Sequence, residues 1–179
     1  GEEYSKANVR MYLRKDLNQK QKLNVRAYLG FVNIVNTSND KYKLKMSAWN
    51  GSDDYMFSER AFSRSESSAH NLPYQQQIFI REGGLKHFTN DSLNSSQWLS
   101  SLYVNYNLFK FLRPYAEGGT NGTDFAYGSG FAIPLGFGGL GFNGGLQLYL
   151  PLITEEGVVD FKDYKNVLRF NVYFRIMTF

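Results

Sequence analysis

The sequence predicts an all-β protein: an antiparallel up-and-down transmembrane β-barrel of about eight to ten strands, or the C-terminal part of a larger barrel. Two observations predict this fold class. Apolar and polar side chains alternate along several stretches, which is the two-residue period of a β-strand. Several stretches also exceed the roughly five or six residues typical of soluble strands and reach the ~9–11 residues of a tilted membrane-spanning strand.

The composition favours strands over a helical bundle. Aromatic residues make up 17% of the 179 residues, and Tyr, Phe and Gly are all frequent, whereas helical bundles favour Ala, Leu, Glu and Lys. The mean hydropathy of −0.41 argues against a helical membrane protein, but it suits a barrel because only alternate strand residues face lipid. The chain has no cysteine, which excludes a disulfide scaffold.

The last predicted strand, residues 165–179, shows the alternation most clearly. Its even positions give the lipid-facing candidates Leu168, Phe170, Val172, Phe174 and Ile176. By strict alternation the final residue, Phe179, falls on the polar face, so we expect the register to end near Ile176 or a bulge to intervene.

The same pattern predicts the other strands. They cover residues 7–14, 23–31, 42–49, 98–108, 125–137 and 140–152, with weaker ones over 74–81 and 112–119. This makes about nine strands, whereas single-chain bacterial barrels have an even number, so either one strand is miscounted or the chain is part of a larger barrel. The cations of the polar faces give the lumen-facing candidates Arg10, Arg14, Arg26, Lys43, Lys45, Arg169 and Arg175.

Small residues line one face of the predicted strand over 125–137, namely Ala126, Gly128, Gly130 and Ala132. Glycine in a strand often marks a close approach of other groups. We therefore expect something bulky, such as a neighbouring side chain or a plug, against this face.

A soluble β-sandwich or lipocalin-like binding module is the main alternative fold, because its apolar strand faces would point into a protein core. Aromatic residues near the strand ends favour the membrane barrel, since they would form an interfacial girdle. They are Tyr42, Trp98, Phe137, Phe142 and Phe179.

We expect no catalytic residue, no metal site and no cofactor. The two histidines, His70 and His87, begin no His-Glu-x-x-His motif, and we expect both to lie in solvated loops. The glycine-rich run over 136–145 lacks the following Lys-Ser/Thr of a phosphate-binding loop. The carboxylates are scattered, so they predict no acid–base pair.

Nine short motifs follow one another in order over roughly residues 50–175. They are Asp54-Tyr55-Met56-Phe57, Phe62-Ser63-Arg64-Ser65-Glu66-Ser67-Ser68, Gln76-Gln77, Glu82-Gly83-Gly84-Leu85-Lys86, Gln97-Trp98, Tyr115-Ala116-Glu117-Gly118-Gly119, Tyr127-Gly128-Ser129-Gly130, Leu148-Tyr149-Leu150-Pro151-Leu152 and Lys165-Asn166-Val167-Leu168-Arg169-Phe170. This order resembles the C-terminal region of large cell-envelope proteins of Bacteroidota in the M1-like (gluzincin) metallopeptidase family. The resemblance implies that a peptidase domain lies upstream, and it carries over no catalytic residue because the zinc-binding motif has no counterpart.

These observations predict a single domain or barrel fragment, residues 1–179, in the outer membrane of a Gram-negative bacterium. The opening Gly1-Glu2-Glu3-Tyr4 is polar, so we expect a mature form or a fragment. We expect the chain to be no enzyme itself but to anchor an associated or upstream domain, with a pore of basic lumen as an alternative. The expected partners are membrane lipid and lipopolysaccharide, the barrel-assembly machinery during insertion and other envelope proteins; no nucleic acid is expected, since the +4 net charge is spread along the chain.

Overall fold

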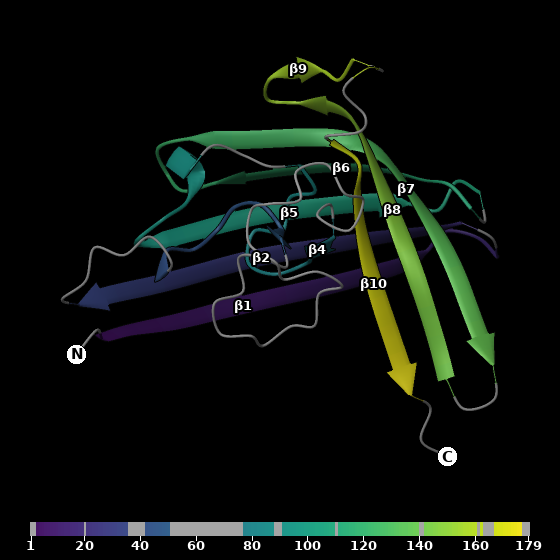
Figure 1. The fold of residues 1–179 in the computed structure, drawn as a ribbon, viewed down its shortest axis with the longest axis horizontal. Helices are drawn as coiled ribbons and strands as arrows, with labels where there is room; N and C mark the ends of the chain where they lie inside the picture. Colours follow the sequence, from purple (N-terminus) through teal and green to yellow (C-terminus); the bar gives the residue numbers. More distant parts are fainter. Residues whose placement is uncertain are drawn as a thin grey trace, which may run out of the picture.

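A computed structural model describes residues 3–19, 21–35, 42–50, 77–87, 91–109, 111–139, 142–160, 162 and 167–176. The fold is all-β, and its main antiparallel sheet is curled into a half-barrel (Figure 1). Along the sheet the strands run β1 (Glu3–Asp16), β2 (Lys22–Val35), β5 (Trp98–Tyr106), β6 (Arg113–Thr120), β7 (Phe125–Gly139), β8 (Phe142–Thr154) and β10 (Arg169–Ile176), and β9 (Gly157–Val158) pairs with β8. Each long strand thus lies beside its predecessor, as expected for an up-and-down sheet.

Tight turns join neighbouring strands at one rim of the sheet, hereafter the tight-turn rim. Between β1 and β2 the backbone N–H groups of Leu17 and Asn18 donate to the carbonyl of Gln21, and the Asn18 side chain accepts from the Gln21 N–H. A second tight connection pairs Phe109 with Leu112 between β5 and β6. β7 continues to Gly139, which pairs with Phe142 at the start of β8.

The alternating pattern sets the two faces of the sheet. On β5 the side chains of Ser101, Tyr103 and Asn105 are buried on the concave face, whereas Leu102 is exposed on the convex face. On β7 the concave face carries the small residues and the convex face carries Phe125, Tyr127 and Leu135. The register across β5, β6 and β7 keeps these faces aligned, since Tyr103 lies opposite Glu117 and Glu117 lies opposite Gly128.

Residues 42–50 and 77–87, hereafter the inner segments, pack against the concave face. They contain the short strands β3 (Trp49–Asn50) and β4 (Ile78–Phe79), which pair with each other. Backbone N–H groups of Gly83 and Leu85 donate to the carbonyls of Lys45 and Met46. Farther along, the short 3-10 helix η4 (Asp91–Leu93) and Ser95 complete the packing, and Ser95 exchanges two backbone hydrogen bonds with Leu44.

Two of the strands predicted for the sheet fall instead in the inner segments. The alternation over 42–49 and 74–81 predicted two strands of the sheet, but Leu44, Met46 and Ile78 are almost completely buried against its concave face. Leu44, Met46 and Leu85 form one apolar cluster with Tyr28 and Leu99 of the sheet. A second cluster joins Ala48 and Ile78 to Tyr103, Tyr115, Ala132 and Tyr149. Tyr42, expected in an aromatic girdle, is buried instead, and its ring packs at a tilt against that of Tyr4, with the ring centres 4.4 Å apart.

The small residues of the concave face fit the inner segments closely, as the sequence predicted. A Cβ on Gly128 would lie 2.8 Å from the His87 ring, and a Cβ on Gly119 would overlap Met46. The expectation that a bulky group approaches the small-residue face of β7 is therefore confirmed. Among the described residues, no helix combines the length and apolar character needed to cross a membrane.

Candidate functional site

A tight turn of the inner segments, residues 82–85, presses its backbone against β2 and β5. Glu82 and Gly84 both have positive φ values, of 45° and 60°, a conformation that glycine adopts without steric cost. The carbonyl of Gly83 accepts hydrogen bonds from Arg26 Nη2 at 2.5 Å and from Ser101 Oγ at 2.6 Å. A Cβ on Gly84 would collide with the Arg26 guanidinium, so this close approach requires glycine.

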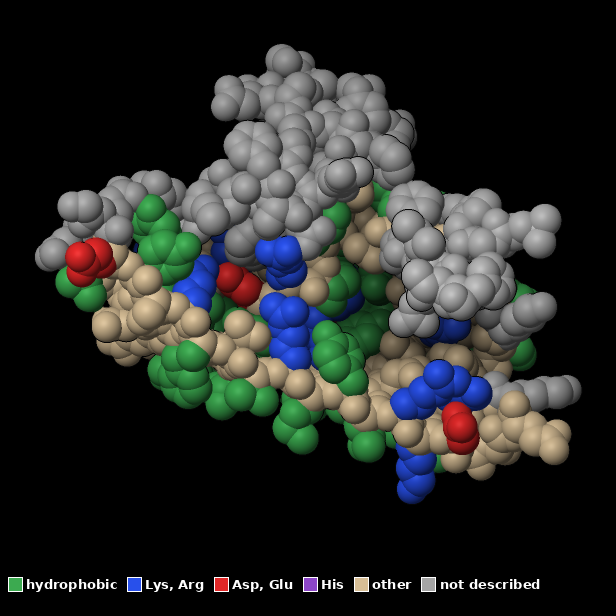
Figure 2. Space-filling view, turned by 90° about the horizontal axis from the view of Figure 1, so that it is seen from below, with side chains coloured by type: hydrophobic (Ala, Val, Ile, Leu, Met, Phe, Trp, Pro, Cys, Tyr) green, Lys and Arg blue, Asp and Glu red, His purple; other side chains and the backbone are tan. Residues whose placement is uncertain are grey.

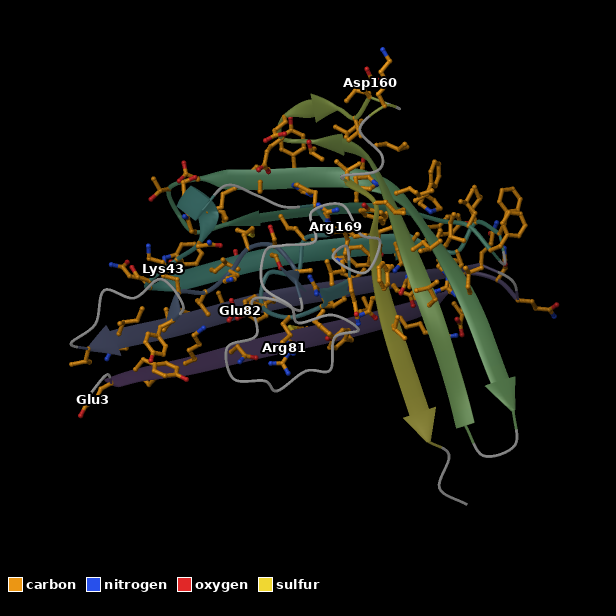
Figure 3. The ribbon with its side chains drawn as sticks, viewed as in Figure 1. Glu3, Lys43, Arg81, Glu82, Asp160 and Arg169 are labelled. Atoms are coloured by element: carbon orange, nitrogen blue, oxygen red, sulfur yellow. The ribbon has the colours of Figure 1, made fainter. Side chains whose placement is uncertain are left out.

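The Glu82 side chain joins the turn to β1 and to the other inner segment. Its carboxylate forms an ion pair with Lys6 Nζ at 3.0 Å and accepts a hydrogen bond from the Lys45 backbone N–H. Lys6 Nζ also donates to the Lys43 carbonyl at 3.2 Å. Figure 3 shows Glu82 and Arg169 within the space that the curled sheet encloses, whereas Glu3 and Asp160 lie at its margins.

A buried ionic cluster, made of Lys86, His87, Glu117 and Glu155, lies next to this turn. Glu117, on β6, accepts hydrogen bonds from the Lys86 backbone N–H at 2.6 Å and from Lys86 Nζ at 3.2 Å. His87 Nδ1 lies 3.5 Å from the same carboxylate, and His87 Nε2 lies 3.3 Å from Glu155, just beyond β8. Lys86, His87 and Glu117 are only 2%, 5% and 6% exposed, so each charge depends on its partner for stabilisation.

Tyrosine rings enclose the Lys86 ammonium. Lys86 Nζ lies 4.1 Å from the ring centre of Tyr103 and 5.5 Å from that of Tyr149, within the range of cation–π attraction. Tyr115 packs against both rings, at centroid distances of 5.6 and 6.0 Å. The Lys86 ammonium also donates to the Gly84 carbonyl, so it holds the turn and the sheet together.

The environment shifts the pKa values of both basic groups of the inner segments, in opposite directions. Burial lowers the pKa of the Lys86 ammonium to about 8, although the Glu117 carboxylate partly offsets this effect. For His87, burial by itself lowers the pKa, but the carboxylates of Glu117 and Glu155 outweigh it and raise the imidazole pKa above its usual value. The cluster therefore favours a protonated His87 that bridges β6 and the end of β8.

The structure distributes the lumen-facing candidates over several environments. Arg26 and Arg169 are buried on the concave side, and Arg10 lies over the Tyr28 ring at 5.7 Å. Arg14 is largely exposed at the tight-turn rim, 3.7 Å from Asp16. Lys43 and Lys45 are half-buried on an inner segment and not on a strand of the sheet. The side chain of Arg175 lies outside the described part of the chain.

The lipid-facing candidates all come from β10 or the residue before it. Phe170 and Val172 are half-buried and lie opposite Leu148 and Leu146 of β8. Leu168, which precedes β10, is half-buried as well. The side chains of Phe174 and Ile176 are not described, and neither are those of Phe137 and Phe142. Phe179 lies outside the described residues altogether.

His87 and the carboxylates near it correct a prediction. The sequence placed both histidines in solvated loops, but His87 is buried between Glu117 and Glu155 because the segment that carries it folds into the half-barrel. His70 lies outside the described residues. Lys86, Glu117, Gly128 and Tyr149, which lie far apart in the sequence, meet at this cluster.

The arrangement is suited to holding segments together. Glu117 already takes part in three contacts with Lys86 and His87, which leaves it little capacity to act as a base. Within the described residues, no group of three His, Cys, Asp or Glu side chains is arranged to hold a metal ion. Comparison with protein-family models, curated proteins and solved structures finds no match.

Proposed function

We propose that the half-barrel is part of an outer-membrane β-barrel that anchors an associated or upstream domain at the Gram-negative cell envelope. One observation carries the proposal: the convex face of the sheet carries exposed apolar side chains, whereas Arg26, Glu117 and Arg169 are buried on its concave face. A soluble protein gains stability by burying apolar area, roughly 25 cal/mol for each Å². The convex face of this sheet leaves its apolar side chains exposed, which suits a protein whose outer surroundings are lipid.

Residues on opposite faces of the sheet illustrate this arrangement. On β5 the convex residue Leu102 is 49% exposed, while its concave neighbours Ser101 and Tyr103 are buried. Phe125 on β7 is 63% exposed, whereas Arg26 on β2 is 6% exposed. The exposed apolar residues continue over the convex face: Val9, Met11, Leu13, Leu29, Phe31, Tyr127, Leu135, Leu152 and Ile153. Figure 2 shows hydrophobic side chains projecting along one margin, with Lys and Arg around a hollow.

The charges of the strands also favour a membrane. Among the described side chains of the sheet, the convex face carries charge only at Glu3 and Lys15, at the two ends of β1. A cation at the bilayer midplane costs ~2–4 kcal/mol, and the cost approaches zero near the interfaces. Phe109 and Phe111, exposed and stacked at 6.1 Å near the tight-turn rim, suit an interfacial aromatic belt.

The anchor is favoured over the open pore by the packing of the concave side. The inner segments occupy this side through two apolar clusters and the buried ionic cluster. Small barrels likewise have their interiors filled with side chains. A soluble sandwich or lipocalin-like module would instead place its apolar faces inward, opposite to the arrangement of β5 and β7.

The proposed family is the Bacteroidota M1-like metallopeptidase family, with this chain as the barrel region of a larger protein. Support comes from the order of the nine motifs and from the convergence of several of them at the ionic cluster. The two ends of the sheet, β1 and β10, suit a barrel that continues beyond the described strands. Lipid, lipopolysaccharide and the barrel-assembly machinery are the partners that this role requires.

A matched pair of lysine substitutions on β1 tests the proposal. Val9 lies mid-strand on the convex face, and its neighbour Asn8 lies on the concave face opposite Gly30. In lipid vesicles, Val9→Lys should lower the free energy of unfolding by ~2–4 kcal/mol, because its ammonium enters the bilayer. Asn8→Lys should change it by less than about 1 kcal/mol.

The wild-type chain provides the companion measurement. We expect it to require detergent for solubility and to migrate faster in gels before heating than after it. Equal stabilities of the two lysine variants, or a monodisperse protein without detergent, would contradict the membrane assignment.

A further inference from the structure

A cavity of about 380 Å³ opens on the concave side, between the buried ionic cluster and the tight-turn rim. Its volume falls within the ~300–1,000 Å³ range of small-molecule sites. The residues that decide its chemistry are three cations, Arg14, Arg26 and Lys86, and three tyrosines, Tyr12, Tyr103 and Tyr149. They come from β1, β2, β5, β8 and an inner segment, so the cavity exists only in the folded half-barrel.

The charges around the cavity are unbalanced toward the positive. Lys86 is paired with Glu117, but Arg26 has no carboxylate within ion-pair distance among the described residues. Its Nη2 donates to the Gly83 carbonyl, while the buried Nε has no hydrogen-bond partner among the described atoms. Within the described residues, Arg14 forms its ion pair with Asp16, at 3.7 Å on the exposed rim. A buried guanidinium without a full set of partners is costly, and a bound anion would satisfy it.

We propose that this cavity binds a small organic anion, a phosphate or carboxylate that carries a planar apolar group. The anionic group binds Arg26 and Arg14, whose guanidinium groups match the geometry of phosphate and carboxylate oxygens. The apolar group packs on the tyrosine rings and on Ile80, which also lines the cavity. The site lies on the face opposite the exposed apolar residues, so the inference does not depend on contact between the convex face and lipid.

Phenyl phosphate is a suitable probe because it combines both parts of the proposed ligand. Its binding to the whole, detergent-solubilised protein is measured by isothermal titration calorimetry, with inorganic phosphate and phenol as the two halves. We expect saturable binding of phenyl phosphate that is at least about tenfold tighter than binding of either half. Equal affinity for phosphate alone would overturn the aromatic part of the site, and equal affinity for phenol would overturn the anionic part.

Two arginines on the same face of β1 provide a matched pair of variants. Arg14 lines the cavity, whereas Arg10 lies over the Tyr28 ring outside it. Arg14→Gln should weaken phenyl phosphate binding by roughly threefold to tenfold, and Arg10→Gln should change it by less than about twofold. Arg10 and Arg14 both lie outside the buried ionic cluster, so both variants should still fold. An equal loss in the two variants would indicate attraction by net charge alone, and it would overturn the site, as would the absence of saturable binding.

Discussion

Glu117→Gln removes the carboxylate at the centre of the buried ionic cluster. The side chain keeps its size, and its amide oxygen can still accept the hydrogen bond from the Lys86 backbone N–H. What is lost is the negative charge 3.2 Å from Lys86 Nζ and 3.5 Å from His87 Nδ1. Removing one partner of a buried ion pair costs about 3–5 kcal/mol, because the other charge remains buried and unpaired.

The loss in the free energy of unfolding caused by Glu117→Gln should depend on pH. In the folded protein the Lys86 pKa of about 8 lies below its unfolded value of 10.5, and Gln at position 117 lowers the Lys86 pKa further. At pH 6 the Lys86 ammonium carries an unpaired buried charge in the variant, whereas His87 keeps its contact with Glu155, so we expect a loss of ~3 kcal/mol in the free energy of unfolding. At pH 9 Lys86 releases its proton, so the loss should fall to ~1 kcal/mol, the value of one hydrogen bond.

Urea unfolding in detergent micelles, followed by tryptophan fluorescence, measures these values. The single variant Lys86→Met and the double variant Lys86→Met/Glu117→Gln complete a thermodynamic cycle. The double variant should lose less stability than the two single variants lose in sum, because Lys86 and Glu117 interact directly. Strictly additive losses, or a Glu117→Gln loss that is the same at pH 6 and pH 9, would refute the reasoning.

Two further predictions concern the contact between the inner segments and the sheet. Gly128→Ala places a Cβ 2.8 Å from the His87 ring, whereas the Cβ of Gly136→Ala on the same strand meets nothing within 4 Å. Gly128→Ala should lower the free energy of unfolding by ~1–3 kcal/mol, and Gly136→Ala should leave it unchanged or raise it slightly. Equal effects of the two variants in urea unfolding would argue against the packing of His87 on β7. The pKa of the His87 imidazole, measured by NMR with His70→Gln to identify its signal, should lie above 6.5. The contribution of His87 to stability is therefore complete below pH 6.5 and is lost as the pH rises through the folded-state pKa. A pKa at or below 6.5 would show that Glu117 and Glu155 do not contact the imidazole.

The two-residue period was sufficient to predict the long strands of the sheet. It identified β1, β2, β5, β6, β7, β8 and β10 and the residues of β5 that share a face. The strand boundaries were less accurate: β10 begins at Arg169, four residues later than expected. The prediction of a sheet strand over residues 42–49 was wrong because alternation indicates only an extended chain whose two sides meet different environments. It does not tell whether the extended chain belongs to the sheet or lies against it, and Leu44 and Met46 meet an enclosed apolar cluster.

The ionic cluster could not be predicted from spacing along the chain. Glu117 and Lys86 are 31 residues apart, and His87 and Glu155 are 68 apart, so only the folding of the inner segments into the half-barrel joins them. Nothing in the local sequence of Glu117 distinguishes a buried carboxylate from an exposed one. The glycines at 83, 84 and 128 were the more informative residues, because each permits a close approach that a Cβ would block.

Accessibility of spin labels tests the central claim, that the convex face contacts lipid, most directly. The chain has no cysteine, so single cysteines at Val9, Leu102 and Asn8 can each carry a nitroxide without background labelling. In lipid vesicles, the labels at Val9 and Leu102 on the convex face should collide more with oxygen than with a water-soluble nickel chelate, and the label at Asn8 on the concave face should show the reverse. Labels at Val9 and Leu102 that are as accessible to the chelate as the label at Asn8 would contradict the account.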